Sequence, residues 1–186
     1  MKKAIFSTEI SLLRRTIQRL LRRKATANLT KILRKTHPAD VALLMRGFSG
    51  SEQKTIFSLC PTFNHKANVL EELDESLIES VLMDESSINI SKMFVYLDTN
   101  DQAAIISMFP NEKQKEILKK IEVEDLEDVE EIMSYPDDSA GSIMTKETFT
   151  LNQNTTIKEA IKKLQYFPEH DKIFNLYVLD DKEKLI

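Results

Sequence analysis

Apolar and polar positions alternate along most of the chain with the period of an α-helix. Between residues 37 and 133 a longer repeat is superimposed on this pattern: an apolar residue followed at once by an acidic or helix-capping residue recurs every 24 or 25 positions. The pairs are Phe48-Ser49, Leu73-Asp74, Leu97-Asp98 and Ile121-Glu122. The repeat predicts a mainly α fold, a superhelical, solenoid-like stack of short helical hairpins in which neighbours complete one another's cores. We therefore expect Leu73 and Leu97 to be buried at matching positions.

Each repeat unit contains one helix that ends at the apolar residue and a second that begins just after it. The expected helices in two of the units are 39–48, 51–59, 88–97 and 100–109. Ser49 and Glu52 have the spacing of a capping box, and Asp98 is placed to cap the helix that follows it. Pro61 and Pro110 lie 49 residues apart, which is two periods, and should end helices at equivalent places.

Residues 1–36 form an amphipathic and strongly basic region. Ile10, Leu13, Ile17, Leu20 and Leu21 follow helical spacing, and the opposite surface is rich in arginine. The region has a net charge of +10, against −14 for the rest of the chain. Such a helix either docks its apolar stripe on the next helices and leaves its basic face in solvent, or contacts an anionic membrane or an acidic partner. Nucleic acid is disfavoured as a partner, because no aromatic residue stands among the arginines and the chain is acidic as a whole.

The stretch 134–145 separates the helical repeat from the first β-type segments. Pro136 should end the acidic helix that runs up to Met133, and Gly141 offers a position with positive φ. Thr156 and Glu159 then have capping-box spacing at the start of a helix. The elements expected after the junction are a strand at 148–151, a helix at 157–166, a largely buried strand at 173–179 and a third strand beginning at 185. This order predicts a partial α+β module.

Composition excludes several classes of protein. The chain has 186 residues, of which 41% are apolar and 30% charged, so it has room for one globular domain and part of another. No stretch approaches the ~18 apolar residues of a membrane helix, so we expect no pore in this chain. The lone Cys60 cannot form a disulfide framework or a multi-thiolate metal site, and we expect it to be buried. The N-terminus has no apolar signal-peptide core, which predicts a cytoplasmic location.

The side chains that commonly perform catalysis are not grouped in a recognisable motif. His37, His65 and His170 lie far apart in sequence, and no glycine-rich phosphate loop is present. His37-Pro38 is interpreted as a helix start with proline in the first turn. We therefore predict that the protein is not an enzyme.

Acidic residues provide the other candidate chemistry. Residues 122–131 contain seven acids in ten positions and keep one apolar face. Mg²⁺ is held by one or two carboxylates and retains several of its waters, so a weak site on such a surface is chemically reasonable. Two acidic surfaces repel each other when bare and approach when cations screen them, so ion concentration can set the distance between domains.

The junction resembles that of MgtE-type magnesium channels. The residues in register with the family's Tyr-Pro-Glu-Asp-Ser-Ala-Gly-x-x-Met-Thr are Tyr135, Pro136, Asp138, Ser139, Ala140, Gly141, Met144 and Thr145, and 37–40 match its His-Pro-Ala-Asp. The resemblance implies a basic helical region at 1–36, a cytosolic N domain at 37–133, a junction at 134–145 and the first half of a cystathionine-β-synthase (CBS) domain at 146–186. Because the family continues beyond this point, we expect a fragment or truncated product with uncovered apolar surface.

The resemblance also implies a magnesium-sensing function without catalysis, in which Mg²⁺ between the N domain and the CBS modules favours a compact, closed state. The family's acidic segment corresponds to 97–104, where Asp101 is kept and Asp98 is added, but Asn100 and Ala104 replace carboxylates; Asn68 stands where the family often has an acid. The predicted metal ligands are Asp98, Asp101, Asp137 and Asp138. Each replacement removes a charge, so binding of the cofactor Mg²⁺ should be weak. Asp98, Asp137 and Asp138 are equally interpretable as helix or turn caps.

The partners implied by the resemblance are the remaining CBS modules and the transmembrane pore of the same channel, with homodimerisation in the full-length protein. A second interpretation is a stand-alone helical adaptor, because the short-helix superhelix also resembles parts of flagellar motor switch proteins. Such an adaptor would use the basic helix and an acidic groove for protein contacts.

Overall fold

The computed structural model describes residues 2–136, 138–144, 148–167 and 175–186, with side chains from residue 10 onward except those of 123 and 124. The chain divides into two compact units, Met1–Ile143 and Met144–Ile186, and each is described by itself. Among the described residues, no helix combines the length and apolar character needed to cross a bilayer.

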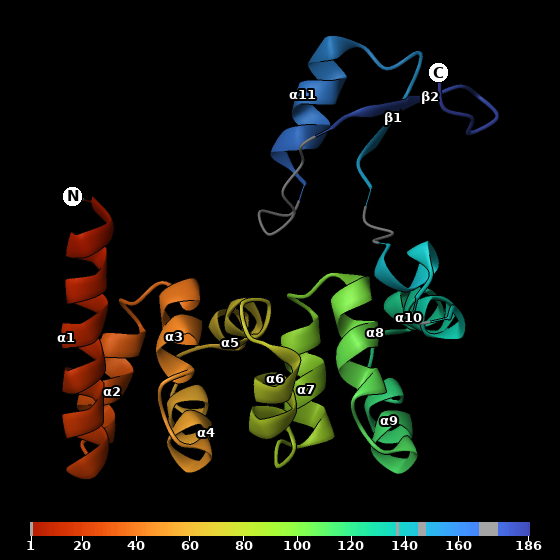
Figure 1. Cartoon of the computed structure of the whole chain (residues 1–186). Helices are drawn as coiled ribbons and strands as arrows, with labels where there is room; N and C mark the ends of the chain where they lie inside the picture. Colours follow the sequence, from red (N-terminus) through yellow and green to blue (C-terminus); the bar gives the residue numbers. More distant parts are fainter. Residues whose placement is uncertain (1, 137, 145–147, 168–174) are drawn as a thin grey trace. The chain divides into compact units, whose positions relative to one another are not determined.

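The first unit is a row of short helices (Figure 1). They are α1 (Lys2–Arg22), α2 (Thr26–Leu33), α3 (Pro38–Met45), α4 (Gly50–Ser58), α5 (Phe63–Leu70), α6 (Glu75–Leu82), α7 (Ser87–Phe94), α8 (Thr99–Ser107), α9 (Asn111–Leu118), α10 (Val123–Ser134) and the 3₁₀ helix η1 (Ala140–Ile143). From α3 onward a new helix begins every 12 or 13 residues, which confirms the predicted hairpin period of 24 or 25.

Alternate helices pack against one another along the row. Helix α3 packs on α5, α5 on α7 and α7 on α9, while α4 packs on α6 and α8 on α10. Helices of eight or nine residues are not stable alone in water, so packing between repeats supplies their stability. Leu73 and Leu97 are 8% and 6% exposed, as predicted, and Phe57, Leu82 and Phe94 are also buried in this unit.

Several of the predicted helices end earlier than expected. Helix α3 ends at Met45 rather than at Phe48, and α7 ends at Phe94 rather than at Leu97. The remaining residues form tight turns, in which the amide of Phe48 donates to the carbonyl of Met45 and the amide of Leu97 donates to that of Phe94. The turn folds each apolar residue back over the core and places the following residue at the next N-cap.

A buried glutamine locks two of these turns. Gln53 Nε2 donates to the carbonyls of Met45 and Phe48, at 3.0 and 2.9 Å. Gln102, two periods later, donates in the same way to the carbonyls of Phe94 and Leu97, at 3.1 and 2.9 Å. Both glutamines are the fourth residue of their helix, α4 or α8. They give a second hydrogen bond to the carbonyls of Met45 and Phe94, which already accept from the turn amides, and they also donate to the carbonyls that close each turn.

The predicted capping residues occupy the expected positions. Ser49 and Glu52 form a complete capping box at α4. Asp98 is the N-cap residue of α8, but its side chain makes no capping hydrogen bond. Helix α4 ends before Pro61 and α8 ends before Pro110.

The predictions for His37-Pro38 and for Cys60 are also confirmed. The imidazole Nδ1 of His37 accepts from the amide of Ala39 at the start of α3, with Pro38 in the first turn. Cys60 is buried, and burial raises the pKa of its thiol to about 12.

The basic N-terminal helix is docked through its apolar stripe. Helix α1 packs on α2 and α3, and Ile17 is fully buried. Arg14 donates to the carbonyl of Gly47 and lies 5.8 Å from the ring centre of Phe48. Helix α1 therefore docks on the next helices, as one of the alternatives from the sequence predicted. Its basic face stays exposed.

The prediction that Gly141 has a positive φ is wrong. No described glycine has one. Gly141 lies in η1, where an added Cβ would stand 2.5 Å from Cγ of Tyr135, so glycine is required because the aromatic ring approaches the backbone closely. The phenol of Tyr135 donates to Glu131 in the last turns of α10, at 3.0 Å, which orients the ring.

The second unit contains β1 (Thr150–Asn152), α11 (Ile157–Gln165) and β2 (Tyr177–Leu179). The strands are parallel, with Thr150 opposite Tyr177, and Leu179 makes an antiparallel bridge to Leu185. Thr156 and Glu159 form the predicted capping box of α11. The strand, helix and strand therefore follow the predicted order, and the third strand is reduced to a single bridge.

The expectation of a largely buried strand at 173–179 is wrong for its described part. Residues 173 and 174 lie outside the described residues, the strand covers only 177–179, and Tyr177 is exposed. One helix cannot cover both faces of a two-stranded sheet. Burial is instead concentrated at β1 and the residue before it, because Leu151 and Phe149 are each 8% exposed. The ring of Phe149 meets that of Phe167 edge to face.

Candidate metal site and family

The two candidate ligands of the first unit lie at the beginning of α8. Asp98 is the N-cap residue and Asp101 is in the first turn, and both are half-buried. Asp101 Oδ1 accepts a hydrogen bond from Asn100 Nδ2, and Asp98 is not without an interaction partner either. A carboxylate at a helix N-terminus is stabilised by the positive end of the helix dipole, and the same dipole opposes a cation there. These two residues therefore have a structural role, and their attraction for a cation is partly offset.

Asn100 and Ala104, the two positions of this segment at which the resemblance implies a missing carboxylate, differ in environment. Asn100 is half-buried; its Nδ2 donates to Asp101 Oδ1 at 3.4 Å, and its Oδ1 is buried and accepts no hydrogen bond from any described residue. Ala104 is exposed, one turn beyond Asp101. The amide oxygen of Asn100 is a neutral donor of a kind that hard cations accept, whereas Ala104 contributes no ligand.

Ala104 lines a groove of about 420 Å³ within the first unit. The groove lies beside α8, α10 and η1, and its other walls include Ile132, Tyr135 and Ile143. Among the described lining residues, Glu75 is the charged one. With alanine at position 104, the described lining of this groove is mainly apolar.

The junction ligands are less well defined. Asp137 lies outside the described residues, and Asp138 is exposed in a turn. Within the described part of the chain, no three His, Cys, Asp or Glu side chains gather closely enough to hold a metal ion. Asp98 and Asp101 are thus brought to one helix end, and the described residues complete no four-carboxylate cluster around them.

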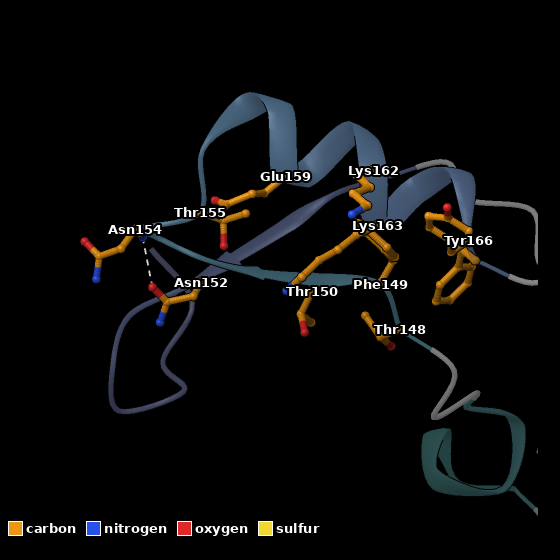
Figure 2. Close-up of a pocket in the computed structure, with 11 residues that line it drawn as sticks. Thr148, Phe149, Thr150, Asn152, Asn154, Thr155, Glu159, Lys162, Lys163 and Tyr166 are labelled. Atoms are coloured by element: carbon orange, nitrogen blue, oxygen red, sulfur yellow. Dashed lines mark hydrogen bonds between the residues drawn. The ribbon is translucent and has the colours of Figure 1, made fainter.

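The second unit has a larger hollow of about 840 Å³ between α11 and β1 (Figure 2). Lys162 and Lys163 of α11 and its C-cap residue Tyr166 line it, together with Thr150 and Asn152 of β1. The hollow is lined by aliphatic and aromatic surface as well as by these polar groups.

Some buried polar groups were not foreseen from the sequence. Lys66 is 9% exposed, with its Nζ 3.6 Å from Glu85 and 5.2 Å from the ring centre of Phe57. Lys66 is the fourth residue of α5, the same helical position as Gln53 and Gln102. Their shared position, the fourth residue of a helix, could have predicted the burial of all three polar side chains, because this position faces the preceding turn.

Known protein families match the chain from residue 36 onward. Residues 36–138 match the MgtE intracellular N domain, and residues 140–186 match the CBS domain. The chain is 24% identical over 168 residues to the magnesium transporter MgtE of Bacillus subtilis (strain 168), covering 90% of this chain and 37% of that protein. It is 23% identical over 174 residues to the magnesium transporter MgtE of Thermus thermophilus, covering 91% and 38%. The chain thus spans little more than a third of the length of these relatives.

Solved structures share the fold. The crystal structure of the cytosolic domain of the Mg²⁺ channel MgtE in complex with ATP matches with a TM-score of 0.81 at 23% identity, covering 92% of this chain and 71% of that one. The crystal structure of the soluble part of a magnesium transporter matches with a TM-score of 0.75 at 16% identity, covering 95% and 70%. The named relatives are magnesium transporters rather than enzymes.

These matches select the magnesium-channel interpretation over the flagellar one. The intracellular N domain alone accounts for more than half of the chain, and the CBS match begins two residues after it ends. The chain therefore belongs to the MgtE family, as an MgtE-type intracellular N domain followed by a CBS segment.

Proposed function

We propose that this chain is the cytosolic, magnesium-responsive regulatory part of an MgtE-type magnesium transporter and that it acts without catalysing a reaction. The observation that carries the proposal is the uninterrupted succession of an N domain and a CBS segment over 36–186, on a fold that matches a cytosolic MgtE domain with a TM-score of 0.81. The proposed division is a basic region at 1–36, the N domain at 37–133, the junction at 134–145 and the CBS segment at 146–186.

The proposed partners are the rest of the CBS modules and a transmembrane pore, in a protein that works at the cytoplasmic face of the membrane as a homodimer. The relatives are more than twice as long as the matched region, which leaves room for these parts in a full-length protein.

The proposed mechanism is weak, regulatory binding of Mg²⁺ at Asp98 and Asp101, supplemented by Asp137 and Asp138. The acidic charge of the chain beyond residue 36 attracts the ion, whereas the helix dipole of α8 and the replacements at Asn100 and Ala104 weaken the site. An ion shifts a conformational equilibrium only by the difference between its affinities for the two states. A site that lacks opposing ligands has little such difference, so the response of this segment should be small.

Small-angle X-ray scattering tests the proposal at matched ionic strength, with MgCl₂ compared with NaCl. Millimolar Mg²⁺ should compact the 186-residue chain only slightly, and a chain extended through complete CBS modules should respond more. Asp101→Ala should reduce the response, whereas Glu79→Ala, which removes an exposed acid from α6, should not. Tight, saturable compaction of the 186-residue chain would contradict the proposal of an incomplete site.

Restoring the missing carboxylates provides the reverse test. Asn100→Asp combined with Ala104→Asp should increase compaction by Mg²⁺ in the extended chain. If the extended chain responds to Mg²⁺ but neither this variant nor Asp101→Ala changes the response, the regulatory role stands and the assignment of the site is wrong.

A further inference from the structure

Helices α1 and α2 carry a dense basic surface. Residues 10–36 contain nine arginine and lysine residues and no aspartate or glutamate. All nine are exposed. The surface lies at one end of the row of helices in the first unit, the opposite end from α10 (Figure 1).

Only part of this charge is used within the fold. Arg14 donates to the carbonyl of Gly47, and Arg22 lies near Glu52, whose pKa is lowered chiefly by hydrogen bonds from Ser49 and further by that arginine. Ion pairs between described residues join Arg46 to Asp74, Lys54 to Asp84 and Lys66 to Glu85, and all three lie outside the basic surface. Most of the positive charge therefore faces solvent.

The arrangement on α1 is that of an interfacial helix. Arg15, Arg19 and Arg23 recur every four residues on the side opposite the buried Ile17, so they share one face. Leu12 lies on the same face and is 65% exposed. An apolar residue among long basic side chains suits the boundary between head groups and acyl chains, where the charges meet phosphate and the leucine leaves water.

We propose that this basic surface docks the N-terminal end of the domain on an anionic membrane. The apolar stripe of α1 stays packed on α2 and α3, so the helix adsorbs through its outer face without unfolding the domain. Each basic residue near an anionic bilayer strengthens binding by about fivefold, and the effect is confined to roughly one Debye length. The proposal goes beyond magnesium sensing and relies on the proposed function only for the presence of a membrane nearby.

Two other kinds of partner fit less well. Single-stranded nucleic acid is bound by basic grooves that also offer aromatic rings for stacking, and residues 10–36 contain no aromatic residue. A second copy of the chain could meet the basic surface with its acidic one, but this would join two different surfaces and build open chains rather than a closed dimer. Neither partner gives a role to the exposed Leu12.

Flotation of the 186-residue chain with vesicles tests the proposal. Vesicles rich in phosphatidylglycerol should bind the protein at low salt, vesicles of phosphatidylcholine alone should not, and added NaCl should release it. The triple variant Arg15→Glu, Arg19→Glu and Arg23→Glu should weaken binding on the order of 100-fold or more. A matched control, Lys115→Glu, Lys119→Glu and Lys120→Glu, makes the same change in net charge at exposed positions near α9 and should bind almost normally.

Each remaining outcome is decisive. Failure of the wild type to bind phosphatidylglycerol, or equal losses in both triple variants, would overturn the proposal, and so would arginine-dependent association without vesicles or a preference for nucleic acid. If the arginine variant does not fold by circular dichroism, glutamine at the same three positions and Leu12→Ser replace it, and both should reduce binding. Scattering in Mg²⁺ without vesicles is independent of this result, so the regulatory proposal stands or fails separately.

Discussion

At Gly141 the absence of a Cβ atom allows the ring of Tyr135 to pack directly on the backbone of the junction. The ring of Tyr135 lies where a Cβ would begin, and the nearest ring atoms belong to the base of the side chain, which cannot move without moving the ring. Gly50 offers the contrast, because the nearest atom to its added Cβ is Ser80 Oγ at 3.9 Å.

We predict that Gly141→Ala lowers the free energy of unfolding by about 1–3 kcal/mol, as expected for overpacking. Gly50→Ala, in helix α4, should be neutral or slightly stabilising. Urea denaturation of both variants measures the difference. In the background of Tyr135→Ala the cost of Gly141→Ala should largely disappear, and a cost that persists there would show that the ring is not its cause.

His65 couples the fold to pH. Its Nε2 is buried and has no hydrogen-bond partner among the described residues, and its pKa is lowered from 6.5, first by burial and then by the neighbouring His37. The unfolded chain therefore takes up a proton near pH 6.5 before the folded chain does. Stability from this residue is complete above that pH and falls as the pH decreases below it.

We predict that the urea midpoint of the wild type decreases as the pH is lowered from neutral through this window. His65→Gln should flatten the decrease, because the titrating group is removed. His37→Asn keeps a helix-capping side chain and removes only the neighbouring charge, so it should flatten the decrease less. Equal pH dependence in the wild type and His65→Gln would rule out this contribution.

Among the elements, the shortness of the helices makes their ends as important as their faces. A helix of eight residues has four amides and four carbonyls at its ends without intrahelical partners, which is about half of its backbone groups. N-cap residues, i to i−3 turns and the buried glutamines Gln53 and Gln102 satisfy many of these groups.

We predict that Gln102→Leu costs about 1–3 kcal/mol of stability, because the carbonyls of Phe94 and Leu97 lose a buried donor. Gln114→Leu is the matched control: this glutamine is half-buried and donates to a single carbonyl, that of Phe109, at 2.8 Å. Its cost should be smaller. Thermal or urea unfolding monitored by circular dichroism measures both losses of stability. Equal losses would show that the two hydrogen bonds of Gln102 stabilise the fold no more than the one of Gln114.

In the whole molecule, the two units have unequal cores. The first unit buries apolar side chains along its entire row of helices, whereas Phe149 and Leu151 are the buried residues in the described part of the second. On the second unit, Ile157 at the start of α11 and its C-cap residue Tyr166 are 81% and 79% exposed. A two-stranded sheet with so small a core is marginally stable.

We predict that the second unit opens at lower free energy than the first. In native-state hydrogen exchange, amides of β1, β2 and α11 should exchange at lower denaturant concentration than those of α5 to α8. Phe149→Ala should speed exchange in the second unit alone, and Ile106→Val should act on the first. A single cooperative opening of all these elements would contradict the prediction.

The sequence alone determined the parts of this protein that depend on neighbouring residues. The repeat of apolar and capping pairs predicted the helices and their period, because a cap, a proline or a turn acts on the few backbone groups beside it. The junction residues likewise identified the family before the fold was known. For the proposed metal site, the sequence placed Asp98 and Asp101 at the start of one helix, and the structure has them there. Their role as ligands stays a prediction.

Only the tertiary structure decided features that depend on residues distant in the chain or on side-chain direction. The requirement for Gly141 comes from the position of the Tyr135 ring, and the burial of Lys66 comes from its packing on Phe57. The exposure of Tyr177 follows from the number of elements that cover the small sheet. Periodicity shows which side of an element is apolar, whereas contacts between elements determine what covers that side and whether its polar atoms find partners.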